Sequence, residues 1–86
     1  MTERSGLTAN VHITLKGGVL DPQGKAVESA LRALGFSGIE GVRQGKFIEL
    51  KLVVSDKEKA RQAVRAMCEK LLANTIIEDY AVDIVD

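Results

Sequence analysis

The sequence predicts a small α+β domain in which two helices cover one face of an antiparallel sheet. Apolar and polar residues alternate near both ends of the chain and in its middle, as in half-buried strands. Two segments between them carry apolar residues at helical spacing and begin with helix-capping residues. The predicted order is therefore strand, helix, strand, strand, helix, strand, and 86 residues suffice for one domain.

The first predicted strand covers residues 7–15. Its apolar members alternate with polar residues, so that one face is buried; they are Leu7, Ala9, Val11, Ile13 and Leu15. Residues 1–6 are polar and are expected to form a flexible N-terminus, which leaves 7–86 as a single domain.

The first predicted helix begins at Pro22, because Asp21 before it is a suitable N-cap and proline is favoured in the first helical position. Gly35 is suited to the left-handed residue that ends a helix, with Phe36 packing over Leu31. One core-facing stripe lies between these ends; it consists of Ala26, Val27, Ala30, Leu31 and Leu34.

The middle of the chain predicts a hairpin. A short extended segment, residues 42–44, precedes Gly45 and Lys46, and residues 47–54 then alternate between apolar and polar. Because glycine is common in tight turns, we expect the chain to reverse at Gly45.

The second predicted helix begins with a capping box of Ser55 and Glu58 and ends near Asn74. A closing strand follows, with Tyr80 and Ile84 on the same face.

Composition narrows the classes of function. Twelve Lys and Arg residues balance twelve Asp and Glu residues, so no net positive field attracts nucleic acid. A small domain with zero net charge does little to repel a second copy and gains from sharing surface with it, so we expect a homo-oligomer. The single Cys68 excludes an intrachain disulfide. Neither a secretory signal nor a membrane span is evident, so we expect a cytoplasmic protein.

The loop of residues 16–25 joins two glycines to a helix start, where backbone amides can bind anions. It matches neither the nucleotide-binding loop nor the dinucleotide fingerprint. Two interpretations remain open, a tight structural turn and a contact with an anion or a partner.

The candidates for catalysis are weak. His12 has no second imidazole and no evident acid partner, which favours a surface or interface role, and no metal site is expected. Cys68 lies on an apolar helix stripe and is expected to be an inert core thiol. The same element order occurs in acylphosphatases, but their phosphate-binding Arg is absent from residues 16–25. RNA-recognition domains also share it, but here Phe47 is the one aromatic residue on the hairpin.

Three strings of the sequence resemble the PurS family, the small subunit of phosphoribosylformylglycinamidine (FGAM) synthase. They are TLKGGVLDPQGKAV at 14–27, ALRALGF at 30–36 and VRQGKFIEL at 42–50. The resemblance spans nearly the whole chain and implies a PurS-like α+β fold for residues 7–86.

The resemblance implies a non-catalytic assembly subunit in purine biosynthesis. It would bridge the synthetase subunit PurL, which uses ATP and Mg, and the glutaminase subunit PurQ, which releases ammonia from glutamine. No cofactor is expected on this chain, no catalytic residue is assigned, and self-association as a dimer or a dimer of dimers is expected. Neither nucleic acid nor membrane is an expected partner. The expected partner contacts are polar residues in loops at strand ends: Lys16, Asp21, Gln23, Gly24, Arg43 and Lys46.

An amino-acid-sensing domain of the ACT type is the alternative. Such domains have a similar order of elements and a glycine-rich ligand loop after the first strand, where Gly17 and Gly18 stand here.

Overall fold

The computed structural model describes residues 6–86. The strands are β1 (Leu7–Leu15), β2 (Gly45–Leu52) and β3 (Glu78–Val85). The helices are α1 (Pro22–Ala33) and α2 (Lys57–Met67), and a π-helical turn η1 (Cys68–Leu72) extends α2. The expected flexibility of residues 1–6 lies outside the described residues except at Gly6.

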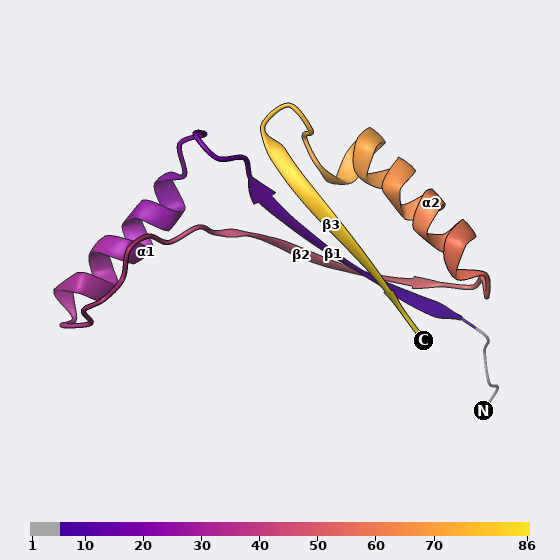
Figure 1. Cartoon of the computed structure of the whole chain (residues 1–86), viewed down its shortest axis with the longest axis horizontal. Helices are drawn as coiled ribbons and strands as arrows, with labels where there is room; N and C mark the ends of the chain where they lie inside the picture. The colour runs from indigo at the N-terminus through magenta and orange to yellow at the C-terminus, as the bar shows by residue number, and fades with distance from the viewer. Residues whose placement is uncertain (1–5) are drawn as a thin grey trace.

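The three strands form an antiparallel sheet with the order β2-β1-β3 (Figure 1). In the central strand, Val11 lies opposite Ile48 of β2 and Val82 of β3. Because paired residues point to the same face, Val11, Ile48 and Val82 share one side of the sheet, together with the other core residues of the three strands. The predicted α+β class with an antiparallel sheet is confirmed.

The core lies between this face and α2. Helix α2 packs over β1 and β3 and contributes Ala60 and Val64, while η1 contributes Cys68. The core strand residues include Val11 and Ile13, both almost completely buried. Cys68 is fully buried, as expected of a core thiol.

The predicted hairpin at Gly45 is wrong. Gly45 is the first residue of β2 and pairs with Thr14, and residues 39–44 run extended into it without a reversal. Pairing with β1 continues to this point because the glycine backbone can lie directly against the Ile13 carbonyl, where a Cβ atom would clash. The sheet of the described residues therefore has three strands, not four.

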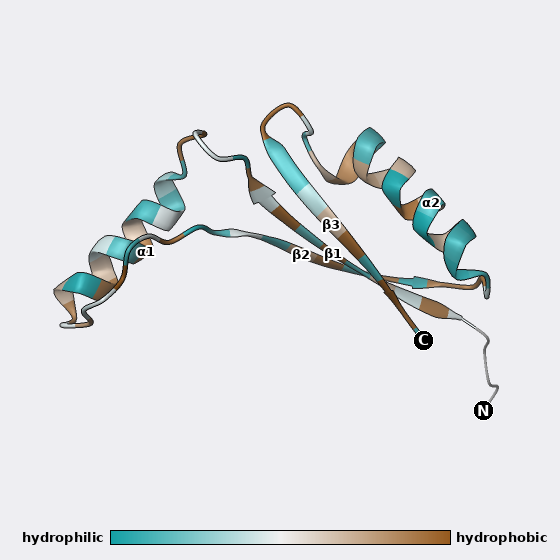
Figure 2. Cartoon of the chain, in the orientation of Figure 1, coloured by the Kyte–Doolittle hydropathy of each residue, from teal (hydrophilic) through white to brown (hydrophobic). Residues whose placement is uncertain are grey.

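The expectation that both helices cover the sheet is also wrong. Only α2 does so, whereas α1 lies beyond the end of the sheet (Figure 1). Brown apolar segments on α1 in Figure 2 belong to a stripe that no strand of the described residues covers. The straight connection through Gly45 carries α1 away from its own sheet.

The ends of α1 form as predicted. Asp21 is the N-cap and Pro22 the first helical residue. At the other end Gly35 has φ 97°, and the amide of Phe36 donates to the Leu31 carbonyl at 3.1 Å, which is the Schellman pattern.

The cap of α2 differs from the predicted capping box. Asp56, not Ser55, is the N-cap, and its Oδ1 accepts from the amides of Glu58 at 2.9 Å and Lys59 at 3.2 Å. A carboxylate is the better acceptor here because its charge also complements the helix dipole.

Candidate partner-binding site

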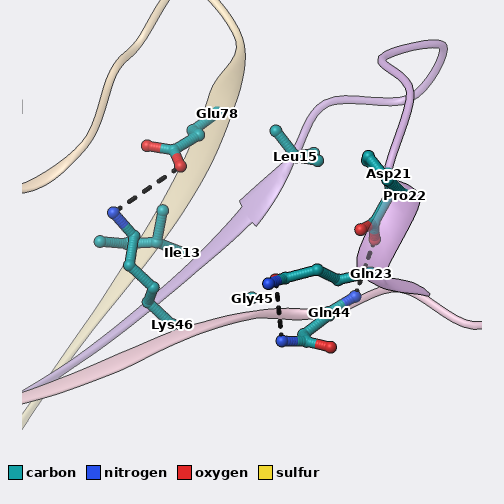
Figure 3. Close-up of a pocket in the computed structure, with 9 residues that line it drawn as sticks. All are labelled: Ile13, Leu15, Asp21, Pro22, Gln23, Gln44, Gly45, Lys46 and Glu78. Atoms are coloured by element: carbon teal, nitrogen blue, oxygen red, sulfur yellow. Dashed lines mark hydrogen bonds and ion pairs between the residues drawn. The ribbon is translucent and has the colours of Figure 1, made fainter. Parts of the chain in front are cut away.

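We call the region where α1 joins the sheet the joint (residues 15–24 and 43–46). All six predicted partner contacts lie in it, and five of them form a hydrogen bond or an ion pair through their side chains. The sixth, Gly24, packs inside it. Residues 17–44, which carry α1, are called the arm. Figure 3 shows part of the joint, with Asp21 and Gln23 from the start of α1 approaching Gln44.

Asp21 links the segment that precedes α1 to the segment that leads into β2. Its Oδ1 accepts from the Gly24 amide at 2.9 Å, and its Oδ2 accepts from the Gln44 amide at 2.9 Å. These two hydrogen bonds, that from Gln44 first, hold the pKa of Asp21 below its ordinary value of 3.8. The N-terminus of α1 is thus occupied by a carboxylate of its own chain. This arrangement supports the interpretation of the loop as a structural turn.

Gly24 has a packing role. It is buried, and a Cβ atom at this position would lie 2.5 Å from both Asp21 Oδ2 and the Val42 carbonyl oxygen. Gln23 beside it is exposed, and its Oε1 accepts from Gln44 Nε2 at 3.0 Å. Of these two residues, only Gln23 presents a side chain to a partner.

The three cations of the predicted set each have a partner within the chain. Lys16 pairs with Asp79 at 2.9 Å, and Lys46 lies 3.8 Å from Glu78. Arg43 Nη2 donates to the Leu15 carbonyl at 2.6 Å. Since the side chains of Lys16 and Lys46 are 40% and 57% exposed, these contacts leave polar surface for a second protein.

A depression of about 490 Å³ lies in the joint. Ile13 and Leu15 supply its apolar part, and Asp21, Gln44, Lys46 and Glu78 supply polar groups (Figure 3). Because both signs of charge line it, it does not favour a simple anion.

Sequence reasoning missed Gln44, Glu78 and Asp79, which bind predicted residues of the joint. The two acidic residues come from β3, more than 60 positions away from Lys16, so no local pattern could reveal them. It also missed Glu28, a buried carboxylate that pairs with Arg32 at 2.7 Å. The i,i+4 spacing of that pair was a usable signal.

The weak catalytic candidates lie apart from the joint. His12 is exposed on the sheet face opposite α2, and its ring lies 4.9 Å from that of Phe47. Burial raises the pKa of the Cys68 thiol, and Glu69 raises it further. Among residues 6–86 we find no group of three or more His, Cys, Asp or Glu placed to hold a metal. No helix in the same range is long and apolar enough to cross a membrane.

Comparison with known proteins identifies the family. The family model described as PurS, phosphoribosylformylglycinamidine (FGAM) synthase, matches residues 8–86. This chain belongs to the PurS family. A Bacillus subtilis relative, phosphoribosylformylglycinamidine synthase subunit PurS, is 47% identical over 86% of this chain and 87% of its own length.

Solved PurS structures have the same fold. PurS of Methanocaldococcus jannaschii matches with a TM-score of 0.81 and 40% identity, over 91% of this chain and 94% of its own. A chain in the structure of PurLQS from Thermotoga maritima matches with a TM-score of 0.85 and 31% identity, over 93% and 98%. The position of α1 beyond the sheet is therefore part of a fold that this family shares.

Proposed function

We propose that this chain is the non-catalytic assembly subunit of FGAM synthase in purine biosynthesis. It joins the synthetase subunit PurL to the glutaminase subunit PurQ, so that ammonia released from glutamine reaches formylglycinamide ribonucleotide. The large subunits use ATP, Mg and glutamine. The assembly is cytoplasmic, this chain enters it as a homo-oligomer, and residues 7–86 act as one unit.

One observation carries this proposal: the fold matches a chain of the PurLQS structure of T. maritima over almost its whole length. The joint agrees with a docking role, because its polar side chains are ordered by contacts within the chain and stay partly exposed. Ordered side chains lose little conformational entropy when a partner binds.

Reversing charges in the joint tests the docking role. The variant Arg43→Glu/Lys46→Glu is compared with Lys59→Glu/Lys70→Glu, which changes the same net charge on exposed positions of α2 and η1. Each is mixed with PurL and PurQ in the presence of glutamine and nucleotide, and co-elution is measured. The joint variant is expected to be lost from the complex and the control to be retained, because like charges across an interface disfavour binding.

Measurements of amidine synthesis distinguish a bridging role of this chain from a catalytic one. With glutamine as the nitrogen source, the joint variant should lower amidine synthesis at least tenfold, whereas synthesis supplied directly with ammonium salt should change little. If the isolated chain alone formed the amidine, the non-catalytic assignment would be wrong. If both variants co-eluted equally well, the joint would not be the docking surface.

The ACT-type alternative has no comparable support. Gly17 and Gly18 lie in an exposed loop, and neither the family model nor the solved relatives favour an amino-acid sensor.

A further inference from the structure

The strand β3 forms the sheet edge on the opposite side of β1 from β2 and the arm. Among residues 6–86 its inner side pairs with β1, and no strand pairs with its outer side. In an edge strand, alternate residues direct their backbone N–H and C=O groups outward. Because β3 is eight residues long, it offers a row of such groups, which is a template that another strand can join.

The face of β3 turned away from α2 is acidic. Four alternate residues of the strand are exposed there, namely Asp79, Ala81, Asp83 and Val85. The strand contains no Lys or Arg. Lys16 pairs with Asp79 at 2.9 Å, but none of the ion pairs among residues 6–86 includes Asp83. The carboxylate of Asp83 is therefore an exposed negative charge beside the open edge.

These carboxylates restrict which strand can join the edge. If two copies paired through β3, Asp79 and Asp83 of one would lie near the same residues of the other, and like charges opposite one another destabilise paired strands. Charged residues on edge strands commonly prevent such pairing. A strand that carries Lys or Arg would instead meet charges of opposite sign. The edge thus disfavours a second copy and favours a cationic segment.

We propose that the open edge of β3 receives an extended segment of one of the two large subunits, and that this segment carries Lys or Arg. The segment adds a strand to the sheet through main-chain hydrogen bonds, and its cations lie next to Asp79 and Asp83. This inference rests on the proposed function and adds a second docking surface to it. A chain that joins two subunits needs two such surfaces, and β3 provides one besides the joint.

Charge reversal at β3 gives the first test. Asp83→Lys is compared with Glu49→Lys, because both residues are exposed and both lie opposite Asn10, one on each outer strand. Each variant is titrated against PurL alone and against PurQ alone, after circular dichroism has shown that it is folded. Asp83→Lys should weaken the binding of one large subunit about tenfold, since it places like charges across the interface. Glu49→Lys should leave both affinities nearly unchanged.

Hydrogen exchange gives the second test, which needs no variant. The amides of β3 that point outward should exchange rapidly in the chain alone and slowly once that large subunit is bound, because the added strand supplies their acceptors. The amides of β3 that bond to β1 should exchange slowly in both states. They serve as the internal reference.

Each result has a distinct meaning. Wild-type affinity of both variants, together with unchanged exchange in β3, would overturn docking at the edge and leave the bridging role intact. Equal losses for the two variants would also overturn it, because the whole sheet face and not the β3 edge would then be the contact. If Asp83→Lys changed the mass of the isolated chain in light scattering, a second copy would occupy the edge and the inference would be wrong. If the wild-type chain bound neither large subunit, the proposed function itself would fail.

Discussion

Asp21 serves two structural purposes with one carboxylate, since it caps α1 and binds the start of β2 through Gln44. The first purpose follows from the sequence, because Asp before Pro is a typical helix start. The second depends on Gln44, which lies 23 positions away and whose amide donor has no sequence signature. The capping contact of Asp21 was therefore predictable from the sequence, whereas its contact with Gln44 was not.

The titration of Asp21 gives a pH prediction. Its folded-state pKa is lowered, so its contribution to stability is complete above the ordinary value of 3.8 and is lost as the pH falls through the folded value. In Asp21→Asn this dependence is absent. Urea midpoints measured at neutral pH and at several points below 3.8 should fall less steeply for the variant. Parallel curves would contradict the role of Asp21.

Gly24→Ala tests the close packing of the joint. The added Cβ would meet Asp21 and the Val42 carbonyl at 2.5 Å, and such overpacking costs about 1–3 kcal/mol. We expect a lower urea midpoint for the variant. Gly17→Ala is the control, because a Cβ there meets nothing within 4 Å and Gly17 is not among the glycines with positive φ. Equal effects of the two substitutions would argue against a packed joint.

The buried thiol gives a third prediction at this scale. Cys68 is fully buried and its pKa is raised, so little thiolate is present or accessible at neutral pH. A thiol reagent such as dithiobisnitrobenzoate should react with it slowly in the native protein and rapidly after unfolding in urea. Rapid reaction of the folded chain would show that the core opens readily.

At the scale of elements, the N-cap of α2 is Asp56 and not the predicted Ser55. Asp56→Ala should cost about 0.5–2 kcal/mol, the usual loss on removal of an N-cap. Ser55→Ala should cost much less, because the amides of Glu58 and Lys59 bond to Asp56. Thermal unfolding of both variants tests this order. A larger loss of stability for Ser55→Ala than for Asp56→Ala would support the capping box instead.

Periodicity located the strands and helices well, because burial on one face dictates it. The error at Gly45 has another origin. Glycine permits a reversal, but it equally permits the close backbone approach to Ile13 that a straight strand needs here. The same residues fit a hairpin within one chain or a continuous strand, so local sequence does not decide between them.

For the whole molecule, stability should depend on chain concentration. If the exposed apolar stripe of α1, which includes Val27 and Leu34, is buried against a second copy, association adds to the free energy of unfolding by mass action. The midpoint of thermal unfolding is therefore expected to rise with protein concentration. A midpoint that stays constant over a hundredfold range of concentration would indicate that single chains carry all the stability.

The position of β1 in the sheet also sets the order in which the protein can fold. The strand β1 precedes both of its neighbours in the chain, and it pairs with β3 across a long separation in sequence, as in the pair of Thr8 and Val85. Such distant pairing makes folding slow compared with local hairpins. Until β3 has been synthesised and has left the ribosome, β1 therefore has one edge without its neighbour.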